Sequence, residues 1–149
     1  MKQFVTTSRQ ETIKLGEKIA RGLRPGTLVA LIGELGSGKT TLVKGIAKGL
    51  GVKSYRYVNS PSFVIIKEYE GKLPLYHFDV FRLDSMGRGQ ACLSPADTFS
   101  FEEYFYGAGV CVVEWADKIK KLLPKKYIEV RISTKRADRR KIVVRNKLK

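Results

Sequence analysis

Two short stretches of the chain are apolar without alternation, at residues 27–32 and 110–113. A continuous apolar run of this length is typical of a strand that is covered on both faces, as in a parallel sheet. The second run leads directly into Glu114 and Trp115, so that strand is expected to end at an acidic side chain. Both runs predict central strands of an α/β fold.

Helical periodicity appears in four other segments. Ser8 followed three residues later by Glu11 is a capping-box sequence, and the apolar stripe behind it predicts a helix that continues to about residue 23. Apolar positions along one face predict a second helix over residues 41–50. Shorter helices are expected over residues 98–106 and 116–123.

The remaining strand signals come mainly in pairs. A turn sequence at residues 70–72 joins two β-like segments, which predicts an antiparallel pair over residues 63–69 and 75–80. Near the C-terminus, the alternating segment 127–133 and the segment 141–145 predict a hairpin across a polar connection at 135–140. A short edge strand is expected over residues 4–6, and an exposed loop within residues 84–95.

The stretch between the first apolar run and the second predicted helix reads Gly33-Glu34-Leu35-Gly36-Ser37-Gly38-Lys39-Thr40. This is G-x-x-x-x-G-K-[ST] between a strand and a helix, the setting in which the motif has meaning. Glycines let the backbone curl and point N–H groups at one spot, and a helix starts at that spot with its positive end, which favours phosphate. We expect Lys39 to reach the β- and γ-phosphates and Thr40 to face Mg²⁺. A chance glycine-rich turn is the alternative, and the flanking strand and helix argue against it.

These patterns predict a single α/β domain over residues 1–149, a P-loop NTPase-like three-layer sandwich with a central mixed, largely parallel β-sheet. No stretch approaches the 18–20 apolar residues of a membrane span, and the first ten residues lack the apolar centre of a signal peptide. We therefore expect a cytoplasmic protein with no membrane partner.

Two acids end predicted strands near this loop. Glu114 follows an apolar run, which is the Walker B pattern, and can hold Mg²⁺ directly, hold it through water, or position the attacking water. Asp79 lies in an alternating segment that puts it on one face with His77 and Phe81. Strand ends of one sheet meet at one edge, so both carboxylates are expected near the loop. The alternative for each is a surface salt bridge.

The segment Ser60-Pro61-Ser62-Phe63 lies at a distance from the loop where many phosphate-loop proteins have a switch segment. A hydroxyl there can complete the Mg²⁺ shell and sense the γ-phosphate, and an ordinary proline turn is the equal alternative. Residues 146–149 imitate the N-K-x-D signature that reads guanine, but the required aspartate is Lys149, which cannot accept the guanine N–H groups. Adenine is therefore the expected base.

The chain carries 29 basic and 14 acidic residues, a net charge of +15. Residues 117–149 contribute 14 basic and 3 acidic residues, or +11, which leaves +4 for the rest. Such a cluster indicates nucleic acid or an acidic partner, with a solubilising surface as the alternative. Two cysteines and one histidine exclude a disulfide framework, a zinc site and a Ser–His–Asp hydrolase.

Four motifs in this order and spacing resemble the TsaE (YjeE) family, small bacterial ATPases needed to make threonylcarbamoyladenosine in tRNA. The resemblance covers nearly the whole chain and rests on residues 33–41, 60–63, 76–83 and 113–115. It implies that ATP and Mg²⁺ are the cofactors. It also implies a TsaD–TsaB-type heterodimer as the partner, which ATP use resets between turnovers, with tRNA reached through that complex.

The resemblance further implies roles for single residues. Lys39 and Thr40 are the expected phosphate and Mg²⁺ residues, and the whole loop with Thr41 contacts the nucleotide. Ser62 is the expected switch hydroxyl, where the family more often has threonine. Asp79 and Glu114 are expected to serve metal binding and hydrolysis, and Trp115 to lie beside the nucleotide.

Two positions depart from the family pattern. The segment 84–98 is longer than the acidic helix that the family has at this place, contains glycine and is nearly free of acidic residues. Phe81 stands where the family usually has tyrosine. Two other functions stay open from the residues themselves. One is a small-molecule kinase, which needs an acceptor pocket and an arginine-bearing lid. The other is a nucleotide-dependent interaction module without enzyme activity.

Overall fold

The computed structural model describes residues 1–61, 65–81 and 101–148 of the chain. In this part of the chain, seven strands form one sheet in the order β1-β7-β6-β2-β5-β4-β3. The strands are β1 (Lys2–Thr6), β2 (Leu28–Ile32), β3 (Ile66–Tyr69), β4 (Leu75–Asp79), β5 (Val110–Glu114), β6 (Lys126–Arg136) and β7 (Arg139–Leu148). The helices are α1 (Arg9–Ala20), α2 (Lys39–Gly49) and the 3₁₀ helices η1 (Tyr55–Tyr57) and η3 (Ala116–Leu122).

The sheet is parallel at its centre and antiparallel at its edges. Strands β6, β2, β5 and β4 pair in parallel, while β7 and β1 continue the sheet antiparallel on one side and β3 on the other. The predicted mixed α/β sheet is thereby confirmed, with parallel pairing confined to the four central strands.

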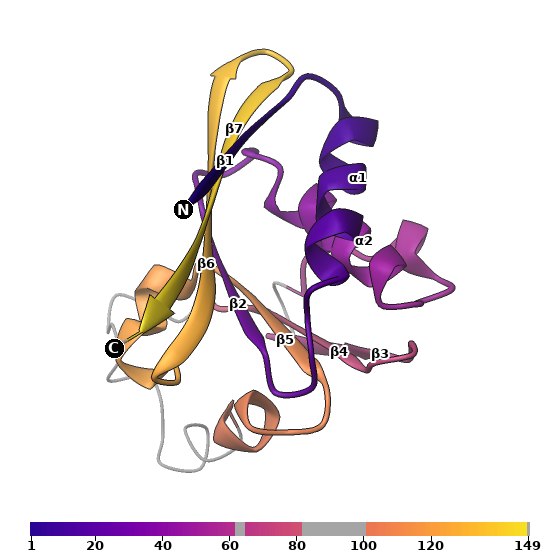
Figure 1. Cartoon of the computed structure of the whole chain (residues 1–149), viewed down its shortest axis with the longest axis vertical. Coiled ribbons are helices and arrows are strands. Elements are labelled where there is room, and N and C mark those ends of the chain that lie inside the picture. Colours follow the sequence, from indigo (N-terminus) through magenta and orange to yellow (C-terminus); the bar gives the residue numbers. More distant parts are fainter. Residues whose placement is uncertain (62–64, 82–100, 149) are drawn as a thin grey trace.

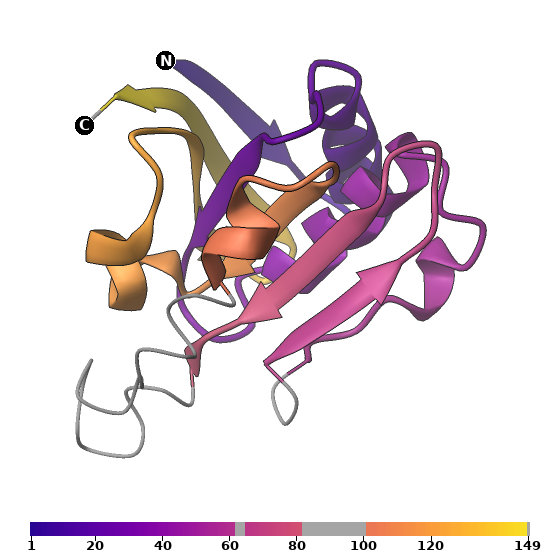
Figure 2. The same cartoon turned by 90° about the horizontal axis from the view of Figure 1, so that it is seen from below.

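Helices cover both faces of the sheet, which explains the unbroken apolar runs. Alternate residues of β2 enter two separate cores: Val29 and Leu31 pack under α1 and α2, whereas Leu28 and Ala30 face a cluster that includes Phe105 and η3. Figures 1 and 2 show α1 and α2 together on one side of the sheet. The result is the predicted three-layer arrangement.

Helix α1 begins as its capping sequence predicts. The Ser8 hydroxyl accepts the N–H of Glu11 at 3.1 Å, and the Glu11 carboxylate accepts the N–H of Thr7 at 2.6 Å. That backbone hydrogen bond is the main reason why the pKa of Glu11 is lowered. The helix ends at Ala20, earlier than predicted, and Arg21 is its C-cap.

Close backbone contact joins α1 to α2. A Cβ atom built on Gly45 would overlap the carbonyl oxygen of Ile13 and lie 2.9 Å from the Cα atom of Gly16. Only glycines permit this approach. The contact sets the position of α2, and with it the residues at the N-terminus of α2 that follow the glycine-rich loop.

The terminal hairpin is longer than the alternation predicts. Residues 135–140 were expected to connect two short strands, but β6 and β7 pair out to Arg136 and Arg139, so this expectation is wrong. Strand β7 lies between β6 and β1 and bonds to both, which supports extended backbone even where the side chains are charged. Strand β3 begins later than predicted, after Ile65 at φ 69°. Residues 101–105 form the described part of the helix predicted over 98–106, and the expected loop within 84–95 lies outside the described residues.

Candidate functional site

The glycine-rich loop joins the end of β2 to the start of α2. Gly36 and Gly38 have φ values of 76° and 105°, the left-handed region that favours glycine. Gly38 is the N-cap residue of α2 and makes no side-chain hydrogen bond. The N–H groups of the first turn are therefore not bonded by an N-cap side chain. An exposed helix N-terminus with free N–H groups is a site for anions.

The side chain of Lys39 lies inside this loop and bonds to its backbone. Its Nζ atom donates to the carbonyl oxygens of Gly33 at 2.7 Å and Glu34 at 2.8 Å, and lies 4.3 Å from the ring centre of Trp115. The residue is only 5% exposed, and burial lowers the pKa of its ammonium group, while Glu114 and Asp79 act to raise it. The cation is therefore held at the floor of the loop with two carboxylates close enough to affect it.

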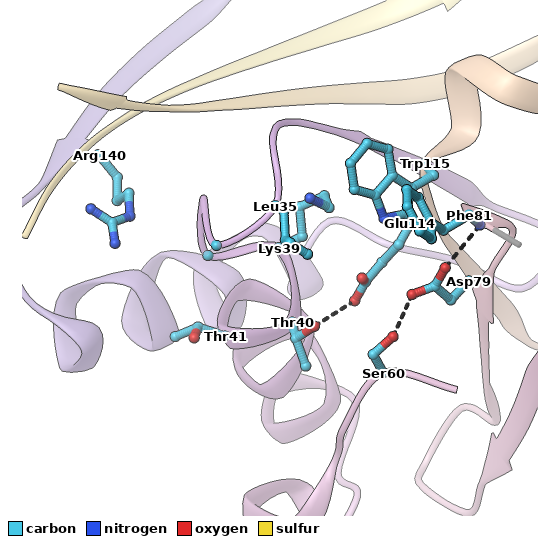
Figure 3. Close-up of a pocket in the computed structure, with 12 residues that line it drawn as sticks. Leu35, Lys39, Thr40, Thr41, Ser60, Asp79, Phe81, Glu114, Trp115 and Arg140 are labelled. Atoms are coloured by element: carbon cyan, nitrogen blue, oxygen red, sulfur yellow. Dashed lines mark hydrogen bonds between the residues drawn. The ribbon is translucent and has the colours of Figure 1, made fainter. Parts of the chain in front are cut away.

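Thr40 and Glu114 meet although 74 residues separate them. The Thr40 hydroxyl donates to Oε1 of Glu114 at 2.9 Å, and Nε2 of His77 lies 3.0 Å from the same oxygen (Figure 3 shows the first bond). A carboxylate only accepts, so Nε2 of His77 carries the proton of this bond. His77 and Glu114 are both buried, and the histidine holds the carboxylate in one orientation toward Thr40.

Asp79 lies next to Glu114 because β4 and β5 pair in parallel with these two residues in register. Its carboxylate accepts the Ser60 hydroxyl through one oxygen and the N–H of Phe81 at 3.0 Å through the other (Figure 3). The two strand-end acids therefore share one edge of the sheet, as their positions predict. Ser62, the expected switch hydroxyl, lies outside the described residues, and within the described part of the segment 60–63 the hydroxyl of Ser60 contacts Asp79.

These side chains line one open cavity of about 370 Å³. Most of the predicted site residues contribute to it, whereas Gly33, Glu34 and Ser37 do not line it. Ser37 is buried, and its hydroxyl has no hydrogen-bond partner in the described part of the chain. The lining residues are Leu35, Gly36, Gly38, Lys39, Thr40, Thr41, Ser60, Asp79, Phe81, Glu114, Trp115 and Arg140.

Four described residues of this region were not among the predicted site residues: His77, Ser60, Phe81 and Arg140. Phe81 was noted as a departure from the family pattern. His77 shares a strand face with Asp79, so the alternation of that segment could have identified it. Ser60 belongs to the predicted switch segment. Arg140 reaches the cavity from β7, on the side of the loop away from the acids (Figure 3), and no local sequence pattern indicates this.

The donor atoms present suit a magnesium nucleotide. Mg²⁺ prefers oxygen ligands and usually takes one or two from protein carboxylates, with the rest from phosphates and water. Glu114, Asp79 and the Thr40 hydroxyl offer this chemistry at the end of an anion-binding loop. Among the described residues, no group of three or more His, Cys, Asp or Glu side chains is arranged to hold a metal without a further ligand.

The rejected guanine signature lies far from this site. Asn146 and Lys147 line a separate cavity with Gly26 and Leu28, at the start of β2, whereas the phosphate loop follows the end of that strand. This position agrees with the conclusion that residues 146–149 do not read a base. No described helix is long and apolar enough to cross a bilayer.

Known proteins resemble this chain over most of its length. A family described as "Threonylcarbamoyl adenosine biosynthesis protein TsaE" matches residues 6–142. A tRNA threonylcarbamoyladenosine biosynthesis protein TsaE from Bacillus subtilis is 42% identical over 138 residues, which cover 92% of this chain and 80% of that protein. One of the same name from Treponema pallidum is 37% identical over 140 residues, covering 94% and 97%. The crystal structure of Bacillus subtilis YdiB is similar with a TM-score of 0.75 and 35% identity, over 99% of this chain and 86% of that one.

Proposed function

The chain belongs to the TsaE family, and on that basis we propose that it is a Mg²⁺-dependent ATPase that supports threonylcarbamoyladenosine modification of tRNA. Family membership supports a role in this biosynthesis. The observation that carries the ATPase part is the meeting of Thr40 and Glu114, 2.9 Å apart, beside Lys39 at the N-terminus of α2. A phosphate-binding loop joined to a strand-end acid is an arrangement that P-loop enzymes use for phosphoryl transfer.

Each residue then has a defined task. The loop N–H groups and Lys39 bind the phosphates, and Lys39 exchanges its carbonyl contacts for phosphate oxygens. Thr40, Glu114 and Asp79 would hold Mg²⁺, which would offset the negative charge that develops on the transferred group. His77 is a positioning residue, since its hydrogen bond orients the Glu114 carboxylate. The protein contributes positioning and charge, with no covalent intermediate on the chain.

The base and its surroundings complete the nucleotide site. Adenine is the proposed base because the chain lacks an aspartate where guanine recognition needs one. Thr40, Asp79 and Glu114, the groups that would hold Mg²⁺, lie at one end of the cavity, and Thr41 and Arg140 lie at the other (Figure 3). We therefore propose that the γ-phosphate binds at the first end and the nucleoside toward the second. Trp115 borders the phosphate end, over Lys39.

The proposed partner is a TsaD–TsaB-type heterodimer in the cytoplasm, with tRNA reached through that complex. This proposal follows from family membership. It predicts slow hydrolysis by the isolated chain if the partner helps to order the switch segment. The nucleotide cavity is open to solvent, which is compatible with completion of the site by another protein.

The test measures phosphate release from Mg²⁺–ATP by the purified chain, with and without a TsaD–TsaB heterodimer. We expect slow turnover alone, faster turnover with the heterodimer, no nucleotide binding by Lys39→Ala, and binding without hydrolysis by Glu114→Gln. Full activity of the isolated chain would contradict the partner role. Unchanged hydrolysis by both variants would contradict the site.

The same assays separate the two other functions. Phosphate transfer to a small-molecule acceptor instead of water would favour a kinase. Function in tRNA modification that survives Glu114→Ala, with partner binding intact, would favour an interaction module without enzyme activity.

A further inference from the structure

A second cleft lies between α1, α2 and η1, with a volume of about 410 Å³. Most side chains around it are cationic, and we call it the basic cleft. Among the residues that the structure describes, none of those that line it is acidic. Besides Gln10 and Ile13, its lining residues are Arg9, Lys14, Lys44, Lys48, Arg56 and Tyr55.

The positive charge of the basic cleft is compensated only in part. The charge of Lys14 helps to lower the pKa of Glu11, after the hydrogen bonds from Thr7. Lys48 faces Glu17 at 3.6 Å, but the two side chains are exposed and partly exposed, and such a pair contributes little. Lys44 is held in place by donating to the carbonyl oxygens of Arg56 at 2.8 Å and Val58 at 2.5 Å. Burial and then the nearby charge of Arg9 lower the pKa of Lys44. A lysine that is held in place beside other cations creates a positive electrostatic potential, and a bound anion would reduce it.

An aromatic ring is set among these cations. Lys48 and Arg56 lie 5.5 Å and 5.1 Å from the ring centre of Tyr55. The neighbouring Tyr57 is 81% exposed, unusual for so large an apolar ring. Cations that follow a phosphate backbone, interleaved with aromatic rings on which bases stack, are the combination that single-stranded and looped nucleic acid binds.

We propose that the basic cleft binds the phosphate backbone of RNA, at a site separate from the nucleotide cavity. The choice of RNA over an acidic protein rests on the ring of Tyr55 among the cations, on the exposed Tyr57 two residues away, and on the family's role in tRNA modification. In this proposal Arg9, Lys14 and Arg56 bind phosphate groups, and the tyrosine rings stack on bases. Lys44 holds η1 in place at the base of the cleft.

The basic cleft and the nucleotide cavity are neighbours but share no lining residue. A small cavity of about 190 Å³ between them contains Arg9 from the first and Gly38, Thr41 and Arg140 from the second. Substitutions in the basic cleft can therefore be separated from loss of nucleotide binding. This separation makes the inference independent of whether the chain hydrolyses ATP.

The test measures fluorescence anisotropy of a labelled tRNA anticodon stem-loop against the full-length chain over a range of salt. The variant is Lys14→Glu with Arg56→Glu, both exposed. The control is Lys125→Glu with Lys135→Glu, exposed residues of the C-terminal third with the same change in charge. We expect the variant to bind RNA at least about tenfold more weakly, with a salt slope reduced by about 1.4, and the control to bind within about twofold of wild type.

Three further results decide the inference. Lys39→Ala, which removes the phosphate-loop lysine, is expected to keep RNA binding, and the cleft variant is expected to keep its Trp115 fluorescence response to nucleotide. Equal losses in variant and control would show general attraction by net charge and overturn the proposal. Failure of the wild type to bind RNA would also overturn it, and loss of heterodimer binding by the variant in that case would assign the cleft to a protein partner.

Discussion

Gly45 provides a test in which local and tertiary effects have opposite signs. It lies within α2, where alanine is favoured over glycine by about 1 kcal/mol of helix propensity. Judged from the helix alone, Gly45→Ala is therefore stabilising. The close contact with α1 predicts the reverse.

The magnitude follows from the atoms that the new methyl group meets. A Cβ atom on Gly45 would lie 2.9 Å from both the Cα of Gly16 and the carbonyl carbon of Ile13, and would overlap the oxygen of Ile13. Carbon atoms in contact are ordinarily separated by about 3.5–4.0 Å, so the helices must move apart by roughly 1 Å. The opposing atoms are backbone and cannot rotate away, which puts the cost near the upper part of the usual 1–3 kcal/mol for overpacking. After the gain in propensity, a net loss of about 2 kcal/mol is expected.

The assay is urea unfolding followed by far-UV circular dichroism, with Gly22→Ala as the matched control. At Gly22 the nearest atom to a new Cβ is 3.7 Å away, an ordinary contact. The control is expected to keep or slightly raise the midpoint, and Gly45→Ala to lower it at an unchanged slope. A Gly45→Ala protein as stable as wild type would refute the close packing of α1 on α2.

Three other predictions follow from the site and the core. Because Trp115 is the only tryptophan of the chain and lies over Lys39, its emission is expected to change on titration with Mg²⁺–ADP, and an unchanged spectrum despite calorimetric binding would contradict this geometry. Arg140→Ala is expected to weaken Mg²⁺–ADP binding about tenfold or more by calorimetry, because it removes a cation of the cavity lining that can donate to a bound anion. Arg139→Ala changes an exposed neighbour and is expected to have no such effect; equal effects would argue against a contact between Arg140 and the nucleotide. Burial raises the pKa of Cys111 to about 12, so this thiol stays protonated at pH 9 and is expected to resist alkylation in the folded chain but not in urea, as peptide mapping can show. Because the thiol ionises more readily in the unfolded chain, its contribution to the free energy of unfolding is lost as pH rises from about 9 toward 12. Rapid labelling of Cys111 at pH 8 in the folded state would contradict its burial.

Elements with a strong local signal could be predicted well. The capping sequence predicted the start of α1. The glycines of the loop predicted a turn from strand to helix, because such a turn uses left-handed backbone that glycine adopts readily. Element ends were predicted less well. The charged residues 135–140 suggested a connection, and only the pairing of β6 with β7 extends the two strands through them.

The candidate site could be predicted in part for the same reason. Glu114 and Asp79 are recognisable because each ends a patterned strand, and parallel strands bring their carboxyl ends to one edge. Arg140 carries no such signal, since its approach to Gly38 depends on how far the hairpin extends. His77 acts through Glu114, and that contact exists only because β4 and β5 are neighbours.

The sequence by itself determined the phosphate loop, the identity of the central strands and the family, because these depend on short-range backbone preference and apolar periodicity. The tertiary structure alone decided which distant groups meet. Thr40 and Glu114 are brought together by the order of the strands, and the five cations of the basic cleft are brought together by the packing of α1, α2 and η1. The charge count had pointed to the C-terminal third of the chain. The distribution of charge along a sequence does not show where the folded surface is concave. A concave cationic surface forms only where residues from separate helices come together.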